Sequence, residues 1–158
     1  MSDGLVITRR FLPHWRLEYS TYFITWCKER NVASLQECER TIVVETILHF
    51  HQVRYHVWAY VVMDDHAHVI ITPMNYELSE ILRSWKSISA LKINRQRGRK
   101  GRLWQPESYD RIVRNETEFV AKMEYILNNP FKRWSGTKEY AWADWTKEEF
   151  SYKPKSEI

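Results

Sequence analysis

Two apolar runs meet at a short acidic turn in the stretch Val61-Val62-Met63-Asp64-Asp65-His66-Ala67-His68-Val69-Ile70-Ile71. Apolar, β-branched residues on both sides of two polar ones predict two antiparallel strands joined as a hairpin. We expect these strands over residues 55–63 and 66–72. The hairpin is the fixed point from which the other elements can be ordered.

Further strands and helices are predicted on both sides of this hairpin in the sequence. Residues 21–28 are β-branched and aromatic, which predicts a strand, and another strand is expected within residues 103–114. Apolar residues recur at helical spacing over residues 35–50, 78–97 and 116–128. Ser34, with Glu37 three residues later, predicts a capping box at the start of the first helix. Pro130 disfavours helical geometry at Asn129, so the last helix should end there.

The order strand, helix, strand, strand, helix, strand is that of the ferredoxin-like unit. We therefore predict an α+β fold with a ferredoxin-like antiparallel sheet and helices on one face, followed by an extra C-terminal helix. A chain of 158 residues is expected to form one domain over residues 1–158. Within it, residues 1–20 are predicted to be irregular and residues 131–158 to be a wrapping tail.

Positive charge is concentrated in one window of the chain. Between Ile81 and Gln105 there is no acidic residue, and the rest of the chain carries 16 basic against 20 acidic residues. A basic stretch on an otherwise acidic protein is typical of polyanion binding, although a solvated helix face is the alternative interpretation. The candidate polyanion-binding residues in this window are Arg83, Lys86, Lys92, Arg95, Arg97, Arg99, Lys100 and Arg102.

Composition also excludes some classes of protein. Cys27 and Cys38 form no CxxC pattern, which fits a reducing cytosol and argues against a disulfide framework or a zinc ribbon. No run approaches the 18 or so apolar residues of a membrane span, and the N-terminus lacks the layout of a signal peptide. A cytoplasmic location is expected. The eight Trp and nine Tyr either face a ligand or pack helices against the sheet.

His66 and His68 lie two residues apart in a predicted strand, so both imidazoles should point to the same face, about 6.6–6.8 Å apart. Such a pair can bind one metal ion; the alternative is two structural histidines with satisfied hydrogen bonds. His49 and His51 have the same spacing at the end of a predicted helix. There, residues i and i+2 project about 200° apart, so that pair should not chelate.

Tyr125 and Asn129 lie four residues apart and share one face of a helix. The alternative interpretation is that Tyr125 packs in the core and Asn129 caps the helix. If this face meets the histidines, two imidazoles and an amide oxygen leave positions open on a divalent ion, and Mn²⁺ accepts nitrogen well. The ion would orient a phosphate as a Lewis acid beside a tyrosine nucleophile.

These features together resemble one known family, the single-tyrosine HUH transposases (IS200-like transposases), most closely their REP-associated branch. The similarity runs from about residue 22 to residue 132. It is carried by Ala59-Tyr60-Val61-Val62-Met63-Asp64-Asp65-His66-Ala67-His68-Val69-Ile70-Ile71, the helix containing Lys86, Leu103-Trp104-Gln105 with Tyr109-Asp110-Arg111, and Tyr125-Ile126-Leu127-Asn128-Asn129-Pro130.

The resemblance implies an enzyme that nicks and transfers single-stranded DNA at hairpin-forming palindromes. By this resemblance Tyr125 is the nucleophile, and its attack leaves a 5′-phosphotyrosine link and a free 3′-hydroxyl. His66 and His68 are implied ligands of Mg²⁺ or Mn²⁺, and Asn129 matches the third ligand, which is Gln in other branches. The implied partner is single-stranded or hairpin DNA, bound by a monomer or homodimer at the bacterial nucleoid. The basic stretch would hold phosphates of the hairpin.

Two departures from the family pattern stand out. The turn before the histidines usually contains Pro-Asn or Pro-Asp, whereas this chain has Asp64-Asp65, and after Pro130 it continues with Phe131-Lys132-Arg133-Trp134 rather than Val, Ala or Gly-Leu. Two other functions stay open at this point. One is a non-catalytic nucleic-acid-binding module on a ferredoxin-like sheet. The other is a metal-dependent nuclease that hydrolyses DNA without a covalent intermediate.

Overall fold

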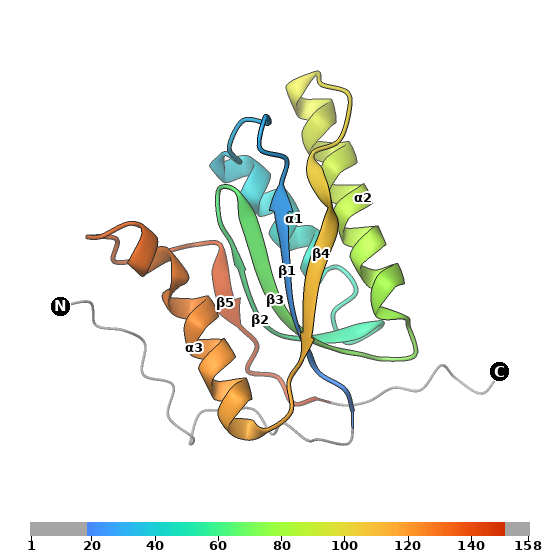
Figure 1. Cartoon of the computed structure of the whole chain (residues 1–158), viewed down its shortest axis with the longest axis vertical. Helices are drawn as coiled ribbons and strands as arrows, with labels where there is room; N and C mark the ends of the chain where they lie inside the picture. The colour runs from blue at the N-terminus through green and yellow to red at the C-terminus, as the bar shows by residue number, and fades with distance from the viewer. Residues whose placement is uncertain (1–18, 151–158) are drawn as a thin grey trace.

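The computed structural model describes residues 19–150, so the irregular conformation predicted for residues 1–20 lies almost wholly outside the described residues. Figure 1 shows an antiparallel sheet between helices. In chain order the elements are β1 (Tyr22–Lys28), α1 (Glu37–Leu48), β2 (Tyr55–Val62), β3 (His66–Pro73), α2 (Leu78–Arg97), β4 (Trp104–Ile112), α3 (Glu116–Arg133) and β5 (Ala143–Trp145).

The strands are ordered β4-β1-β3-β2-β5, and each neighbouring pair is antiparallel. The first four strands have the ferredoxin-like order, which confirms the predicted fold class. α1 and α2 bury their apolar faces against one side of the sheet, where Trp26 of β1 packs in one cluster with Val43 of α1 and Trp85 of α2. α3 covers the other side, where Phe119 packs in one cluster with Trp58 of β2.

Buried indoles form much of the core, and three of them, on Trp58, Trp85 and Trp104, donate hydrogen bonds. Trp85 Nε1 donates to the Tyr55 hydroxyl at 2.8 Å, and that hydroxyl donates to the Ile47 carbonyl at 2.6 Å. Trp26 and Trp58 are also buried, whereas Tyr109 and Tyr125 are 63% and 45% exposed. The buried tryptophans of the sheet therefore serve packing, whereas these two tyrosines present their rings at the surface.

The start of α1 differs from the prediction. The helix is capped by Gln36, whose backbone N–H donates to the Glu39 carboxylate at 2.8 Å, and not by Ser34 with Glu37. The reason lies in Leu35, which is buried and whose backbone N–H donates to the Asp64 carbonyl at 2.7 Å. This tie to the β2–β3 turn holds residue 35 outside the helix.

The end of α3 is also a correction, because the helix continues through Pro130 to Arg133. A proline inside a helix removes one backbone donor and crowds the preceding turn, which is costly but not prohibitive. Here Pro130 is buried, and its carbonyl accepts from the Trp134 N–H at 2.9 Å. Arg133, in the added turn, makes ion pairs with the β2–β3 turn that hold the helix end in place.

The segment predicted as a wrapping tail supplies a fifth strand. β5 pairs with β2, with Trp145 opposite Ala59, and Trp134 and Tyr140 pack against the core cluster under α3. β5 was not predicted, because its three residues are too few to show an alternation of apolar and polar side chains. Within residues 19–150, no helix has the length and apolar character needed to span a membrane.

Candidate active site

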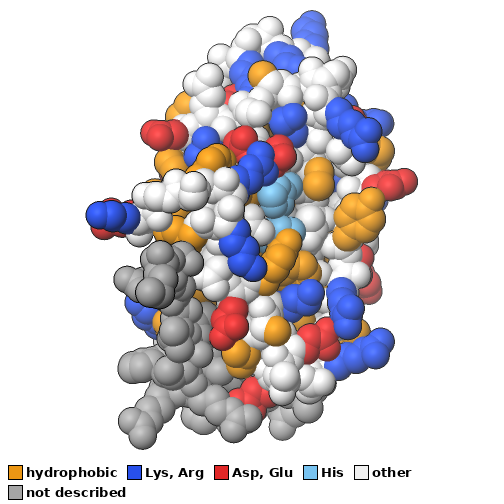
Figure 2. All heavy atoms as spheres, turned by 60° about the vertical axis from the view of Figure 1, so that its left-hand side comes forward, with side chains coloured by type: hydrophobic (Ala, Val, Ile, Leu, Met, Phe, Trp, Pro, Cys, Tyr) orange, Lys and Arg blue, Asp and Glu red, His pale blue; other side chains and the backbone are white. Residues whose placement is uncertain are grey.

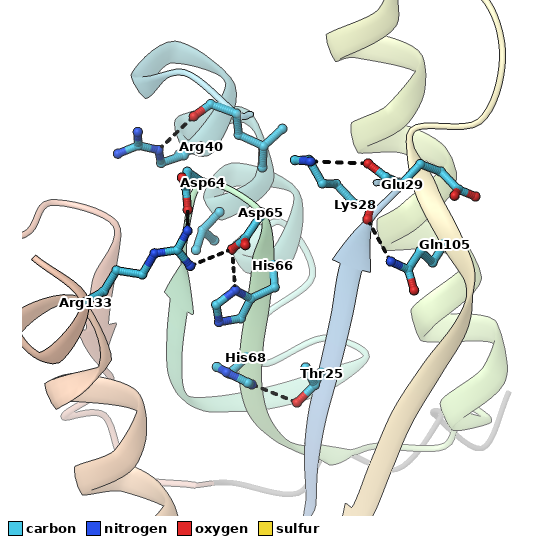
Figure 3. Close-up of polar contacts among 12 residues, drawn as sticks. Thr25, Lys28, Glu29, Arg40, Asp64, Asp65, His66, His68, Gln105 and Arg133 are labelled. Atoms are coloured by element: carbon cyan, nitrogen blue, oxygen red, sulfur yellow. Dashed lines mark hydrogen bonds and ion pairs between the residues drawn. The ribbon is translucent and has the colours of Figure 1, made fainter. Parts of the chain in front are cut away.

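The two histidines begin β3 and project toward the side of the sheet that carries α3, as Figure 3 shows. Their ring centroids are 4.7 Å apart, while Ala67 between them is buried. The His66 side chain is 18% exposed, and His68 is buried. The i, i+2 alternation of the strand therefore places both imidazoles on one face, with His66 nearer to solvent.

Each imidazole uses its Nδ1 atom in a hydrogen bond. His66 Nδ1–H donates to the Asp65 carboxylate at 2.6 Å, and His68 Nδ1 is 2.7 Å from the Thr25 hydroxyl on β1 (Figure 3). His68 Nε2 is buried and has no hydrogen-bond partner in the described part of the chain. Metal-binding histidines are typically held in this way, with one ring nitrogen fixed by a neighbour and the other facing the ion.

Burial keeps His68 in its neutral form. Desolvation, followed by the charges of His66 and Lys122, lowers the pKa of His68 to about 3. A metal ligand must be deprotonated at the nitrogen it offers, so the ring is ready at neutral pH. For Asp65, burial opposes ionisation, but hydrogen bonds from His66 and Arg133 hold the pKa of the carboxyl below its usual range.

Tyr125 of α3 lies directly beside this pair. Its ring centroid is 5.3 Å from that of His68, and Phe23 of β1 stacks on His68 at 5.3 Å. The Lys122 ammonium lies 4.6 Å from the Phe23 ring centroid and 6.0 Å from that of Tyr125. The structure thus brings the predicted nucleophile and both predicted imidazole ligands together, with a cation beside them.

Two asparagines follow Tyr125 on α3. At about 100° per residue, Asn129 lies about 40° from Tyr125 around the helix, on the side of Lys122, while Asn128 lies about 60° away on the opposite side. Because Lys122 contacts Phe23 of β1, that side of α3 faces the histidines. The Asn128 amide oxygen is itself buried and lacks a hydrogen-bond partner among the residues described. The helix geometry favours Asn129 as the third ligand.

The donor set fits a divalent ion of the Mg²⁺ or Mn²⁺ kind. Over residues 19–150, no group of three or more His, Cys, Asp or Glu gathers as a metal site. The candidate donors are two imidazole nitrogens and, from its position on the helix, the Asn129 amide oxygen, a set that would leave positions open for a substrate oxygen. A closed tetrahedral zinc site would need a fourth protein ligand.

The predicted basic residues lie on and after α2, on the other side of the sheet from α3. Three of them make side-chain hydrogen bonds within the fold. Lys86 Nζ donates to the Gln105 carbonyl at 2.7 Å, Arg97 binds the Glu39 carboxylate at 2.8 Å, and Arg99 donates to the Asn94 amide oxygen at 3.0 Å. The remaining five are exposed, and one of them, Arg102, also lies 3.9 Å from the Glu29 carboxylate in an ion pair. These five are Arg83, Lys92, Arg95, Lys100 and Arg102.

The loop between α2 and β4 nevertheless reaches the edge of the sheet where the histidines lie. Lys28, at the end of β1, donates its N–H to the Asp65 carbonyl at 2.8 Å and accepts from the Gln105 side chain at 3.0 Å. These bonds connect the histidine turn to the start of β4 (Figure 3). Lys100 and Arg102 therefore stand at the same end of the sheet as His66, as Figure 1 also shows for their loop.

Four residues of the site were not predicted from the sequence, and one of them is Phe23, which stacks on His68. Lys122 precedes Tyr125 by three positions on the helix, a spacing that could have indicated it. Thr25 orients His68 only because β1 pairs with β3 in the register that puts these residues opposite each other. Arg133 lay beyond the predicted helix end, so no pattern pointed to it.

Comparison with known proteins decides the family. The family model for IS200-like transposases matches residues 15–129. The chain belongs to the IS200-like transposases. Membership makes this transposase a DNA-processing enzyme, of a family that generally uses a divalent metal ion.

Two solved structures share the fold. A REP-associated tyrosine transposase bound to a REP hairpin matches with a TM-score of 0.65 and 20% identity, over 84% of this chain and 82% of that chain. A candidate transposase from Deinococcus radiodurans R1 matches with a TM-score of 0.50 and 19% identity, over 74% of this chain and 97% of that chain. No curated protein sequence matches this transposase.

Proposed function

We propose that this transposase nicks and rejoins single-stranded DNA beside a hairpin, with Tyr125 as nucleophile and a divalent ion held by His66, His68 and Asn129. The observation that carries the proposal is the 5.3 Å separation between the rings of Tyr125 and His68, on two elements far apart in sequence. The bound hairpin of the structurally similar REP-associated transposase supports the choice of substrate. A location at the bacterial nucleoid belongs to the same proposal.

The chemistry is a transesterification. The Tyr125 hydroxyl oxygen forms a bond to the scissile phosphorus, the bond from phosphorus to the 3′ oxygen breaks, and the released 3′ oxygen takes a proton as the tyrosine loses one. The product is a 5′-phosphotyrosine and a free 3′-hydroxyl, and the reverse reaction rejoins a strand. A bound divalent ion would supply Lewis-acid stabilisation of the phosphate. The Lys122 ammonium is close enough to the tyrosine ring to bind the same phosphate.

A path for the unpaired strand leads away from the site over β1 and β4. α3 packs mainly over β2, β3 and β5 and touches the other half of the sheet at Phe23 of β1 and Arg111 of β4, while Tyr109 on β4 stays exposed. His68, Thr25 and Tyr109 stand opposite one another in register across β3, β1 and β4, so Tyr109 is about 10 Å from His68 along the row. Figure 2 shows histidine side chains on this face among apolar and basic ones. An exposed Tyr109 ring is suited to stack on a base next to the cut.

A labelled hairpin oligonucleotide with a single-stranded flank tests the proposal. Incubated with Mn²⁺ or Mg²⁺, the protein should form a covalent adduct that survives denaturing electrophoresis and is absent in EDTA. Tyr125→Phe should form no adduct. Tyr109→Phe is the matched control, because it removes a hydroxyl from another exposed tyrosine on the same face and should leave the adduct in place.

The outcomes separate the alternatives. Cleavage without an adduct in the wild type would identify a hydrolytic nuclease. Binding without cleavage, unchanged by EDTA, would identify a binding module. An adduct of equal yield in Tyr125→Phe would refute the assignment of the nucleophile.

A further inference from the structure

Two neighbouring aspartates in the β2–β3 turn receive one arginine from the end of α3. Arg133 Nη2 is 2.9 Å from an Asp64 carboxylate oxygen, and Arg133 Nη1 donates to Asp65 Oδ1 at 3.0 Å. Figure 3 shows the guanidinium reaching across from α3 to both carboxylates. The planar fork of arginine suits such a two-point contact, which a lysine would make with a single point charge.

The same Asp65 oxygen also binds the first histidine. His66 Nδ1–H donates to Asp65 Oδ1 at 2.6 Å, so the guanidinium and the imidazole share one acceptor atom. A carboxylate in this position fixes the proton on Nδ1 and turns the Nε2 lone pair outward. Arg133 limits the rotation of that carboxylate, because moving it would break the contact with the guanidinium.

Arg133 is also on the same helix as the proposed nucleophile, Tyr125. Tyr125 lies eight residues before Arg133 on the same helix, about 12 Å along its axis. A shift of the helix end relative to the turn would carry Tyr125 with it. Through its contacts with the turn, Arg133 therefore holds His66 and the helix that carries Tyr125 in place relative to each other.

We propose that Arg133 is a positioning residue that acts through Asp65 on His66 and through α3 on Tyr125. This inference rests on the proposed function, since it concerns how that site is held. A simpler role is that Arg133 only complements the dipole at the end of α3. Lys132 shares that role, being basic and in the same last turn, but makes no ion pair among the residues described. Lys132→Met is therefore the matched control.

Mn²⁺ titration of the DNA-free protein by calorimetry tests whether Arg133 acts through Asp65 on His66. Asp65→Asn should weaken Mn²⁺ binding on the order of 10-fold, as loss of a residue that supports a metal ligand does. Arg133→Met should weaken it measurably and Lys132→Met should not. The double variant of Asp65 and Arg133 should lose less affinity than the sum of the two single losses, because both changes break the contact between Arg133 and Asp65. Arg133→Lys, which keeps the charge, should recover part of the affinity and serves if the Met variant does not fold.

Amide hydrogen exchange, measured without any metal, tests whether Arg133 holds the end of α3 in place. Residues 126–134 of Arg133→Met should exchange faster than those of the wild type and of Lys132→Met. Equal Mn²⁺ affinity in Arg133→Met and wild type, fully additive effects in the double variant, or unchanged exchange would each overturn the proposal. If the wild type binds no Mn²⁺, that result would instead overturn the metal site of the proposed function and the action of Arg133 on His66. Hydrogen exchange would still decide whether Arg133 holds the end of α3.

Discussion

Replacing Thr25 by valine removes one hydroxyl from the site and keeps the shape of the side chain. That hydroxyl is 2.7 Å from His68 Nδ1, in a place where His68 is buried. Leaving a buried polar atom without its partner costs about 1–3 kcal/mol of folding stability. The ring also loses the contact that sets its orientation, and losses of this kind weaken metal binding about 10–100-fold. We expect the lower end, about 10-fold or about 1.4 kcal/mol, because Phe23 and Tyr125 still hold the ring on two sides.

Mn²⁺ titration and urea unfolding of the same variant measure the two effects separately. Thr72→Val is the control, since Thr72 is also buried on the sheet and its hydroxyl accepts from Trp58 Nε1 at 2.8 Å, four residues along β3 from His68. The control should lose stability and keep its Mn²⁺ affinity. If Thr25→Val binds Mn²⁺ as tightly as the wild type, the hydroxyl does not orient His68 and the reasoning fails.

Four further predictions concern the ligand set, the DNA path and the core. Asn129→Ala should weaken Mn²⁺ binding and adduct formation, whereas Asn128→Ala should leave both nearly unchanged; the reverse result would move the third ligand to Asn128. Tyr109→Ala should weaken binding of a flanked hairpin in EDTA by about 1–3 kcal/mol, while Tyr109→Phe keeps the stacking surface and should bind normally. Lys100→Gln should lower the slope of log Kd against log salt by about 0.7–0.9, and an unchanged slope would remove this residue from the DNA contact. Burial, followed by the charge of His51, lowers the pKa of His56 to about 3. In the unfolded chain His56 therefore takes up a proton near pH 6.5, whereas in the folded protein it stays neutral. Through this residue, the free energy of unfolding should fall by about 1.4 kcal/mol per pH unit below pH 6.5. Urea unfolding between pH 7 and 5 should show a shallower decline in His56→Gln.

Local patterns were sufficient for most of the fold. The alternation around His66 and His68 placed both on one face, and the helical spacing of Tyr125 and Asn129 put them on one side of α3. These are periodicities of two and 3.6 residues, which the backbone enforces whatever lies around it. What they could not provide is the register between strands.

Long-range contacts explain each difference from the sequence prediction. Thr25 meets His68 across 43 residues of chain, and Arg133 meets Asp65 across 68. Neither contact has a local pattern. α3 passes through Pro130 because its last turn is anchored on another element, and α1 starts late because Leu35 is bound to Asp64. The acidic turn that departs from the family pattern is the acceptor in three of these contacts, two from Arg133 and one from the Leu35 N–H.

The two edges of the sheet differ in their exposure to other chains. β5 covers the outer side of β2, whereas β4 ends the sheet on the opposite side. Unpaired strand edges invite other chains to add to them, and natural proteins discourage this with proline and charge. β4 carries Pro106, Glu107, Asp110 and Arg111 along its length, and Lys86 occupies the carbonyls at its start. The β4 edge should therefore resist the addition of a strand from another chain.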